Sequence, residues 1–247
     1  MLEIRHLSVR RASSTVLSDL SLTLPRGSMT ALVGKNGCGK STLLSAIGGT
    51  CPYAGEIKLD GTPTKELPPR ELAKKMSRLP QLLSSPHMTV AELVLLGRHP
   101  HVGALSRPTE KDQAACSHAI AEVGIAHLAD CYLDELSGGE RQRAYLAMTV
   151  AQDAPLWLLD EPTTYMDPSV SRQLMSLLCR LRKEREKTVL VAMHDLSSAV
   201  RYADRIALID EGTLSFCGSV EECLEAHVLE DVFSVRRLDA NGEIFFV

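Results

Sequence analysis

The feature that most constrains this fold is a glycine-rich segment between an apolar run and a helix-like pattern. Residues 34–41 read Gly-Lys-Asn-Gly-Cys-Gly-Lys-Ser and match G-x-x-x-x-G-K-[ST] at every fixed position. The apolar run over 29–33 predicts a strand, and Leu43, Leu44 and Ile47 follow the loop at helical spacing. Strand, glycine loop and helix in this order predict an α/β fold that binds phosphate at the loop.

The residue types in this loop suit a nucleotide. Glycines let successive backbone N–H groups converge on phosphate oxygens, and the following helix adds its positive end. Lys40 would place an ammonium on the outer phosphates, and the Ser41 hydroxyl can ligate Mg²⁺. A glycine turn with an exposed lysine is the alternative, which the flanking strand and helix disfavour. We expect binding contacts from Gly34, Lys35, Asn36, Gly37, Cys38, Gly39, Lys40, Ser41 and Thr42.

Two further apolar runs predict buried parallel strands, each ending at a polar residue. Residues 156–159 lead into Asp160 and residues 188–193 lead into His194, with a helical pattern between the two runs. An acid at such a strand end can hold the magnesium shell, so Asp160 is a second candidate metal ligand. Its neighbour Glu161 can polarise a water as a general base. A solvated acidic turn is the alternative for an isolated Asp-Glu pair.

The stretch from about 86 to 152 predicts a helical insertion. Residues 109–112, Thr-Glu-Lys-Asp, resemble a capping box that opens a helix. The segment 136–140, Leu-Ser-Gly-Gly-Glu, precedes another helical pattern and offers a hydroxyl and bare amides to an anion. An ordinary helix cap is the alternative. Because the chain has one phosphate loop, a second anion site suggests a nucleotide held by another copy.

The C-terminal segment from residue 206 onward predicts two turns. Residues 206–209 and 213–216 read as a hairpin closed by a glycine turn, and Asn241-Gly242 reads as a second turn before the apolar C-terminal residues.

Composition narrows the class of protein. The 247 residues carry 27 Lys and Arg against 31 Asp and Glu, a net charge of −4, so no general positive field favours a nucleic-acid partner. The longest uncharged stretch, 41–55, is shorter than the roughly 20 apolar residues of a spanning helix. The first residues lack a secretory pattern, so we expect a cytoplasmic protein. Seven cysteines without a C-x-x-C pair argue against a disulfide framework or a zinc knuckle.

The motifs resemble those of the ATP-binding-cassette ATPases in order and spacing, over essentially the whole chain. The resemblance rests on Gly34–Thr42, Gln81, Leu136–Glu140, Leu156–Glu161, Asp167 and His194. It implies an α/β P-loop ATPase with a mostly parallel core sheet and an N-terminal antiparallel β sub-domain. The core would span about 1–85 and 153–247, with the helical sub-domain inserted over about 86–152. It also implies MgATP hydrolysis by two cassettes packed head to tail.

The resemblance implies roles for residues whose local pattern is ordinary. Glu161 resembles the catalytic carboxylate and His194 the sensor of the γ-phosphate. Gln81 would join the metal or water shell and link ATP to the helical sub-domain. Asp167 would reach across the interface between the two cassettes of the dimer. Three residues of one copy would close over the ATP held by the other: Ser137, Gly138 and Gly139.

Three residues near the phosphate loop depart from the family pattern or add to it. Arg11 stands where the family usually has an aromatic residue that stacks on adenine, and a guanidinium can also stack on a base. Lys35 stands where proline is common and adds a cation, with a solvent-facing lysine as the alternative. The thiol of Cys38 predicts inactivation by alkylating reagents, with protection by ATP.

Finer similarity points to importers of iron–siderophore, haem or cobalamin complexes. It lies in residues 93–101, which include Gly-Arg-His-Pro-His, and in residues 160–167. It implies a peripheral subunit on the cytoplasmic face of the cell membrane, with integral permease subunits as partners and an external substrate-binding protein as an indirect one. A metal site at His99-Pro100-His101 is disfavoured because Pro100 removes helical i,i+4 geometry.

Three alternatives stay open to test. A cassette ATPase without a transporter, such as an iron–sulfur assembly type, fits the same length. A P-loop small-molecule kinase is opposed by the 136–140 segment. A nucleotide binder that does not hydrolyse is disfavoured because Lys40, Asp160, Glu161 and His194 are all present.

Overall fold

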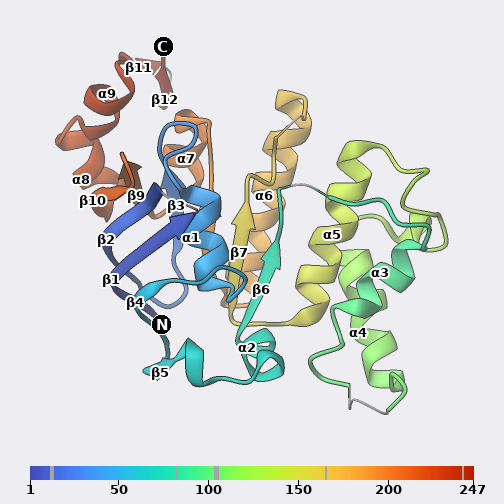
Figure 1. The fold of residues 1–247 in the computed structure, drawn as a ribbon. Coiled ribbons are helices and arrows are strands. Elements are labelled where there is room, and N and C mark those ends of the chain that lie inside the picture. The colour runs from blue at the N-terminus through green and yellow to red at the C-terminus, as the bar shows by residue number, and fades with distance from the viewer. Residues whose placement is uncertain (12–13, 82, 103–105, 165, 241) are drawn as a thin grey trace.

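The fold was analysed in a computed structural model, which describes residues 1–11, 14–81, 83–102, 106–164, 166–240 and 242–247. Its N-terminal part forms an antiparallel four-stranded sheet in the order β2-β1-β4-β5 (Figure 1). In β1, Leu2, Ile4, Leu7 and Val9 are buried, as expected for a sheet that packs on one face. The strand bounds are β1 (Leu2–Arg11), β2 (Ser14–Leu24), β4 (Ala54–Leu59) and β5 (Thr62–Pro63).

The core is a six-stranded sheet in the order β10-β9-β3-β8-β7-β6. Its neighbours pair in parallel except β10, which lies antiparallel on the β9 edge. Every residue of β3, β7 and β8 is buried, which explains why these strands are apolar on both faces. The bounds are β3 (Met29–Val33), β6 (Met76–Leu79), β7 (Leu156–Asp160), β8 (Thr188–Ala192), β9 (Arg205–Asp210) and β10 (Thr213–Ser219). The predicted α/β class with a mostly parallel core and an antiparallel N-terminal sheet is confirmed.

Two apolar clusters lie on opposite faces of the core sheet. Met29, Ala31 and Val33 of β3 belong to one cluster, and Leu32 between them belongs to the other. The Leu32 cluster places α1 (Lys40–Ile47) between the core sheet and the N-terminal sheet. The other cluster joins the sheet to α5 (Gly138–Gln152), α6 (Pro168–Glu184) and α7 (Leu196–Tyr202). Helix α1 is therefore held from two sides, which fixes the phosphate loop at its N-terminus.

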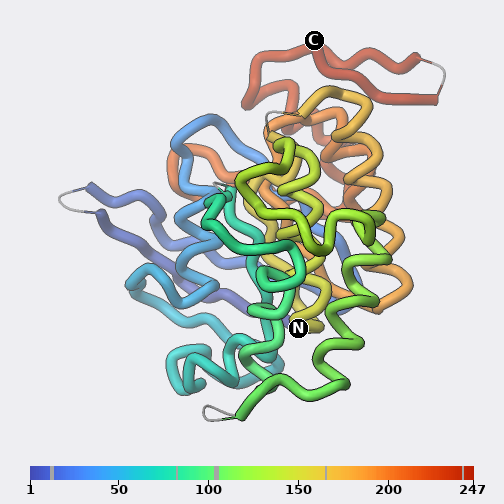
Figure 2. The backbone as a smooth tube through the Cα atoms, turned by 90° about the vertical axis from the view of Figure 1, so that its right-hand side faces the viewer, coloured from blue at the N-terminus to red at the C-terminus, as the bar shows by residue number. Residues whose placement is uncertain are grey.

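Three helices stand together beside the core, as the green and yellow-green segments show in both views (Figures 1 and 2). They are α3 (Val90–Leu96), α4 (Glu110–Glu122) and α5, and each packs against the other two. Thr109 caps α4 with a capping box to Asp112, which confirms that sequence prediction. That these helices form a separate sub-domain with the limits given above stays a prediction.

The remaining elements include the hairpin at one edge of the core sheet and a separate two-stranded sheet of β11 and β12. The predicted hairpin at 206–216 is confirmed as β9 and β10. The predicted turn at Asn241-Gly242 falls in part on Asn241, which lies outside the described residues. None of the helices in the described ranges is long and apolar enough to span a bilayer. The other elements are η1 (Thr64–Glu66), α2 (Pro69–Lys75), η2 (Ala126–Leu128), α8 (Val220–Glu225), α9 (Val228–Phe233), β11 (Arg237–Ala240) and β12 (Glu243–Phe246).

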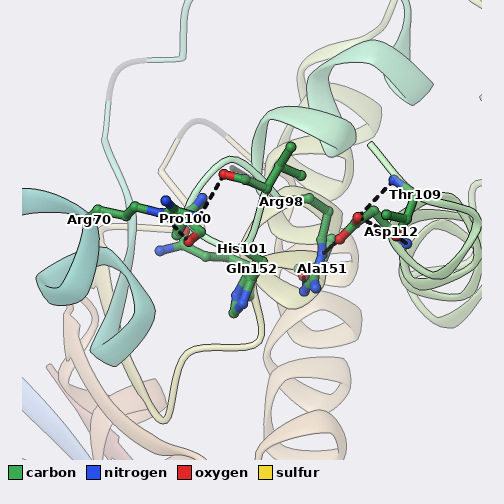
Figure 3. A network of polar contacts seen from close by, with 9 residues as sticks. Arg70, Arg98, Pro100, His101, Thr109, Asp112, Ala151 and Gln152 are labelled. Atoms are coloured by element: carbon green, nitrogen blue, oxygen red, sulfur yellow. Dashed lines mark hydrogen bonds and ion pairs between the residues drawn. The ribbon is translucent and has the colours of Figure 1, made fainter. Parts of the chain in front are cut away.

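A polar network ties the loop after α3 to its neighbours (Figure 3). Arg98 donates through Nε to Asp112 Oδ1 at 3.1 Å and through Nη1 to the Ala151 carbonyl at 2.7 Å. From α2, Arg70 donates to the carbonyls of Pro100 and Val102. The network thus joins the loop to α2 on one side and to α4 and α5 on the other.

The carboxylate of Asp112 gives a stability prediction. Hydrogen bonds from Thr109, and then the Arg98 guanidinium, lower the pKa of Asp112 to about 2. A depressed carboxyl pKa stabilises the folded state above the unfolded value, 3.8, and this contribution fades as pH falls toward 2. We expect Asp112→Ala to lower the free energy of unfolding at pH 7 by about 1–2 kcal/mol, the usual worth of a helix cap.

Urea unfolding at pH 7 and at pH 3 measures this effect. The difference between variant and parent should be smaller at pH 3. Glu110→Ala, at an exposed acid in the same first turn of α4, is the control and should change stability by less. A difference for Asp112→Ala that is the same at both pH values would contradict the role given to its charge.

Candidate functional site

A cavity of about 570 Å³ lies at the phosphate loop, where the carboxyl ends of the central strands meet. This is the edge of an α/β sheet at which ligands commonly bind. Ten of the sequence-predicted site residues contribute to its wall, so segments far apart in the chain converge here. The wall consists of Arg11, Val16, Asn36, Gly37, Gly39, Lys40, Ser41, Thr42, Gln81, Glu161, Thr164 and His194.

Two loop glycines are required by close packing. Gly39 caps α1 with φ 110°, and a Cβ there would come within 2.5 Å of the Leu17 side chain. A Cβ at Gly34 would collide with the Ile209 carbonyl oxygen and with the Cys38 sulfur. Neither position accepts a side chain without displacement of β2 or β9. The loop therefore lies directly against both sheets, with its backbone N–H groups at the N-terminus of α1.

Lys40 and Ser41 begin α1 and present a cation and a hydroxyl at the loop. Lys40 is buried, and its Nζ donates to the Gly34 carbonyl at 2.8 Å and to the Lys35 carbonyl at 3.4 Å, which leaves one ammonium hydrogen for a phosphate oxygen. Ser41 donates through Oγ to Asp160 Oδ1 at 3.0 Å. Burial raises the pKa of Asp160, and the Ser41 hydroxyl and the Arg78 guanidinium oppose that shift. Asp160 is held just beneath the cavity, not in its wall.

Glu161 is the acidic residue that faces the cavity. Its backbone has φ 52°, a left-handed conformation that a non-glycine residue rarely adopts. Its buried carboxylate accepts from Gln81 Nε2 at 2.5 Å and from Thr164 Oγ1 at 3.2 Å, and it pairs with His194 Nε2. The turn after β7 thus directs this carboxylate to the place where Gln81 and His194 meet. Gln81, Glu161 and His194 come from three different strand ends.

Two residues in this wall were not singled out from the sequence. Thr164 holds the Glu161 carboxylate, and Val16 lines the cavity beside Arg11. The signal for Thr164 was its position three residues after Glu161 in a tight turn. Nothing in the local sequence pointed to Val16, since it lies on β2, far from the loop in the chain.

Arg11 lies at the cavity wall, on the side of the N-terminal sheet. Among the described lining residues there is no Phe, Tyr or Trp, so the guanidinium is the planar group available to a base on this side. Lys35, in contrast, is exposed and lines a neighbouring hollow with Asp210 and Glu211. Lys35 therefore takes part in the loop through its backbone carbonyl, which accepts from Lys40 Nζ at 3.4 Å.

The expectation that Cys38 is a readily alkylated thiol is revised by its surroundings. Its side chain is 9% exposed and packs in the apolar cluster with Leu17 and Ile209. Burial raises the pKa of the Cys38 thiol, and the Lys40 charge offsets that shift only in part. The thiolate is the reactive form. Cys38 therefore contributes its backbone to the loop, and its sulfur belongs to the core.

We expect Cys38 to react with iodoacetamide at pH 7.5 at least about 10-fold more slowly than the half-buried Cys51, because a buried neutral thiol is a poor nucleophile. Peptide mass spectrometry over a time course measures both sites in one sample. Equal alkylation rates at Cys38 and Cys51 in folded protein would contradict this prediction.

The residues expected to act on another copy do not line the cavity of their own chain. Ser137 caps α5 through a capping box with Glu140, and both Ser137 and Gly138 are exposed. Gly139 is half-buried near Val170. Asp167 precedes α6, is exposed, and makes no side-chain bond to that helix. These side chains and amides are thus open to a second molecule.

Within the described ranges, no group of three or more His, Cys, Asp or Glu side chains could hold a metal ion. His101, part of the His-Pro-His segment, pairs through Nε2 with the Gln152 carbonyl at 2.8 Å, which is a structural role. An oxygen pair is nevertheless present at Ser41 and Asp160. Mg²⁺ commonly takes one or two carboxylates together with substrate phosphates, so this donor set fits that ion.

Comparison with known proteins agrees with the geometry. Residues 17–164 match the family model described as ABC transporter. The ferric enterobactin transport ATP-binding protein FepC of Escherichia coli (strain K12) is 39% identical over 224 residues, which are 90% of this chain and 83% of that protein.

Two solved structures resemble the fold closely. A putative metal-chelate type ABC transporter in an inward-facing conformation has a TM-score of 0.85 at 27% identity, over 100% of this chain and 96% of that one. The ATP-binding cassette MJ0796, described as a dimer bound to ADP and Pi in a post-hydrolysis state, has a TM-score of 0.78 at 25% identity, over 89% of this chain and 99% of that one.

Proposed function

This chain belongs to the ABC transporter family as a cassette ATPase, and we propose that it powers an importer of a metal chelate. The observation that carries the proposal is the Glu161 carboxylate, which Gln81, Thr164 and His194 hold at the wall of the phosphate-loop cavity. A loop that only bound nucleotide would not need a buried, strained acid at this place. We infer that Glu161, His194 and Gln81 are the residues that act on ATP.

The proposed reaction is in-line attack of water on the γ-phosphorus of ATP. Glu161 accepts a proton from that water as the new P–O bond forms and the bond to the bridging oxygen of ADP breaks. Lys40 and the loop amides stabilise the charge on the phosphate oxygens. His194 holds the γ-phosphate, and Gln81 orients the water or the metal shell. Positioning and electrostatics supply most of the rate, as in other phosphoryl transfers.

The residues that would hold Mg²⁺ are Ser41 and Asp160, and Gln81 would complete the metal or water shell. When bound, Mg²⁺ would supply positive charge that neutralises part of the charge of the phosphates. The 3.0 Å hydrogen bond from Ser41 Oγ to Asp160 Oδ1 keeps two oxygen ligands side by side beneath the cavity. Their closeness supports the metal assignment.

We infer that two copies close head to tail on two ATP molecules. Ser137, Gly138 and Gly139 are open to a second molecule, and α5 directs its positive end toward them. The dimeric form of the MJ0796 cassette supports this arrangement. Asp167 would lie at the same junction. Each site would then combine the phosphate loop of one copy with the Ser137 segment of the other.

We infer further that the chain works on the cytoplasmic face of a membrane, with permease subunits and, indirectly, an external substrate-binding protein. FepC is a ferric enterobactin transport protein by name, and one of the solved structures with a similar fold is a putative metal-chelate type ABC transporter. A ferric siderophore is therefore the proposed cargo, and haem and cobalamin are the alternatives.

Affinity purification of the full chain from detergent-solubilised membranes of its own cell tests this role. We expect a polytopic membrane protein to co-purify, and we expect reconstituted vesicles containing both to take up a ferric siderophore only with ATP. A complex carrying the Glu161→Gln chain is the control and should not transport. Recovery of soluble iron–sulfur assembly proteins instead of a membrane protein would overturn the proposal in favour of the assembly type.

A further inference from the structure

A second and larger cavity, of about 890 Å³, lies on the other side of the metal-site residues. It opens beyond the C-terminal end of α1, where residues 48–53 pass α2 and β6. Its described lining residues include apolar side chains such as Leu72 and Met76, and two cations, Lys65 and Arg78. None of the described lining residues is acidic.

Arg78 is the residue that connects this cavity with the nucleotide site. It lies on β6, one strand away from Asp160 at the end of β7. Its Nη2 is 3.6 Å from Asp160 Oδ2 and donates to Ser45 Oγ at 3.1 Å, while Nη1 donates to Thr50 Oγ1 at 3.1 Å. One guanidinium thus touches the acid, the middle of α1 and the wall of the large cavity.

The two carboxylate oxygens of Asp160 have different partners. Oδ1 accepts from Ser41, the proposed metal partner, and Oδ2 faces Arg78. The Asp160 side chain is 3% exposed and the Arg78 side chain is 27% exposed, so the pair reaches from the interior to the cavity surface. The long contact between them leaves room for a shift, and the buried Nε of Arg78 has no hydrogen-bond partner among the described residues.

Mg²⁺ and Arg78 would share the negative charge of one carboxylate. A cation at Oδ1 weakens the attraction between Asp160 and the guanidinium and repels the guanidinium directly, because like charges repel more strongly where water is excluded. Ser45 and Thr50 would still hold Arg78 on the cavity side. Occupation of the metal site would therefore move Arg78 toward the large cavity.

We propose that Arg78 is a positioning residue for Asp160 and that it couples the metal side of the nucleotide site to the 890 Å³ cavity. The inference rests on the proposed function, since it takes Asp160 as a metal ligand. By linkage, the coupling acts in both directions: whatever draws Arg78 into the cavity favours Mg²⁺ at Asp160. The cavity is then a place from which the ATPase can be controlled.

Cys51, which lines the same cavity beside Thr50, reports on this coupling. A cation that approaches a thiol favours its reactive thiolate. We expect saturating MgATP to raise the iodoacetamide alkylation rate of Cys51 in the full chain by at least about twofold. ATP with EDTA should leave the rate unchanged. Mass spectrometry of the Cys51 peptide measures the rate, with the half-buried Cys131 as internal reference.

Three variants show whether the MgATP effect on the Cys51 alkylation rate depends on Arg78 or is a general effect of nucleotide binding. Arg78→Met should abolish the MgATP effect on Cys51, and Arg78→Lys should retain part of it. Lys65→Met removes the other cation of the cavity wall without touching Asp160, and should keep the full effect. A MgATP effect in Arg78→Met equal to that of the parent would overturn the proposal, and so would the absence of any effect in the parent.

Binding of fluorescent ATP, measured on the same samples with and without Mg²⁺, distinguishes this proposal from the proposed function. If no variant binds MgATP, the nucleotide site itself is wrongly assigned. If all bind MgATP and Cys51 responds alike in all of them, the site stands and the role of Arg78 fails.

Discussion

A Glu161→Gln variant is expected to bind MgATP as tightly as the parent chain while its turnover falls by about 10²–10⁴-fold, the usual worth of a general base. The amide has the shape of the carboxylate, so the bonds to Thr164 and His194 can largely be kept. It cannot accept the proton of the attacking water. Binding is preserved because the loop amides and Lys40 contact the phosphates independently of this residue. Phosphate release and fluorescent ATP binding measure the two quantities.

The control for this variant is Glu211→Gln, which changes an acid on the rim of the neighbouring hollow by the phosphate loop. Its turnover should stay within about twofold of the parent, because it lies outside the proposed reaction. Hydrolysis by Glu161→Gln at the parent rate would show that another group activates the water. Loss of ATP binding in that variant would show that the carboxylate shapes the cavity.

A Ser137→Arg variant is expected to bind ATP normally as a single chain and to lose at least about 100-fold in turnover, as when a stabilising donor to a reacting anion is removed. Ser137 is exposed and does not line the cavity of its own chain, so the substitution leaves the phosphate loop intact. The long side chain would block the approach of α5 to the nucleotide of a second copy. ATP binding and phosphate release again measure the two effects.

The chain offers a matched control for the loss of the helix cap. Ser219 caps α8 with the same capping box, to Glu222, that Ser137 forms with Glu140. Ser219→Arg should lower stability by a similar amount, about 1 kcal/mol, and leave turnover unchanged. If both variants lose turnover to the same extent, the effect comes from helix stability. If neither does, the Ser137 segment has no part in hydrolysis.

Much of the fold could be predicted because its strongest signals are local. The runs that became β3, β7 and β8 are largely apolar, with Thr30, Asp160 and Thr188 as their polar positions, and such runs occur in strands with both faces covered. The Thr109 cap follows from two residues three positions apart. The order of the strands in the sheet, with β3 between β8 and β9, depends on crossovers that no local pattern contains.

The site was predictable where its residues belong to compact motifs, and less so elsewhere. Lys40, Ser41, Asp160 and Glu161 stand beside recognisable strands, so their placement could be expected. Arg78 lies in a short strand with no motif, and it gains its significance only because parallel pairing sets β6 beside β7.

Cys38 belongs to a compact motif, but its side-chain environment could not be predicted from that motif. Its neighbours in the chain are exposed or lie at the loop, yet its sulfur is packed in the core. The direction of a side chain in an irregular loop depends on the three-dimensional path of the backbone, here on the close approach of Gly34 to β9. Reactivity inferred from a position in a motif therefore had to be revised once burial was known.

Sedimentation velocity of the Glu161→Gln chain, with and without MgATP, tests most directly whether this is a cassette completed by a second copy. Without nucleotide we expect the 27.0 kDa chain. With MgATP we expect a species of twice that mass. This species should be absent from a chain that carries both Glu161→Gln and Ser137→Arg. A chain that binds MgATP at saturation and still sediments at 27.0 kDa would contradict a composite site between two cassettes.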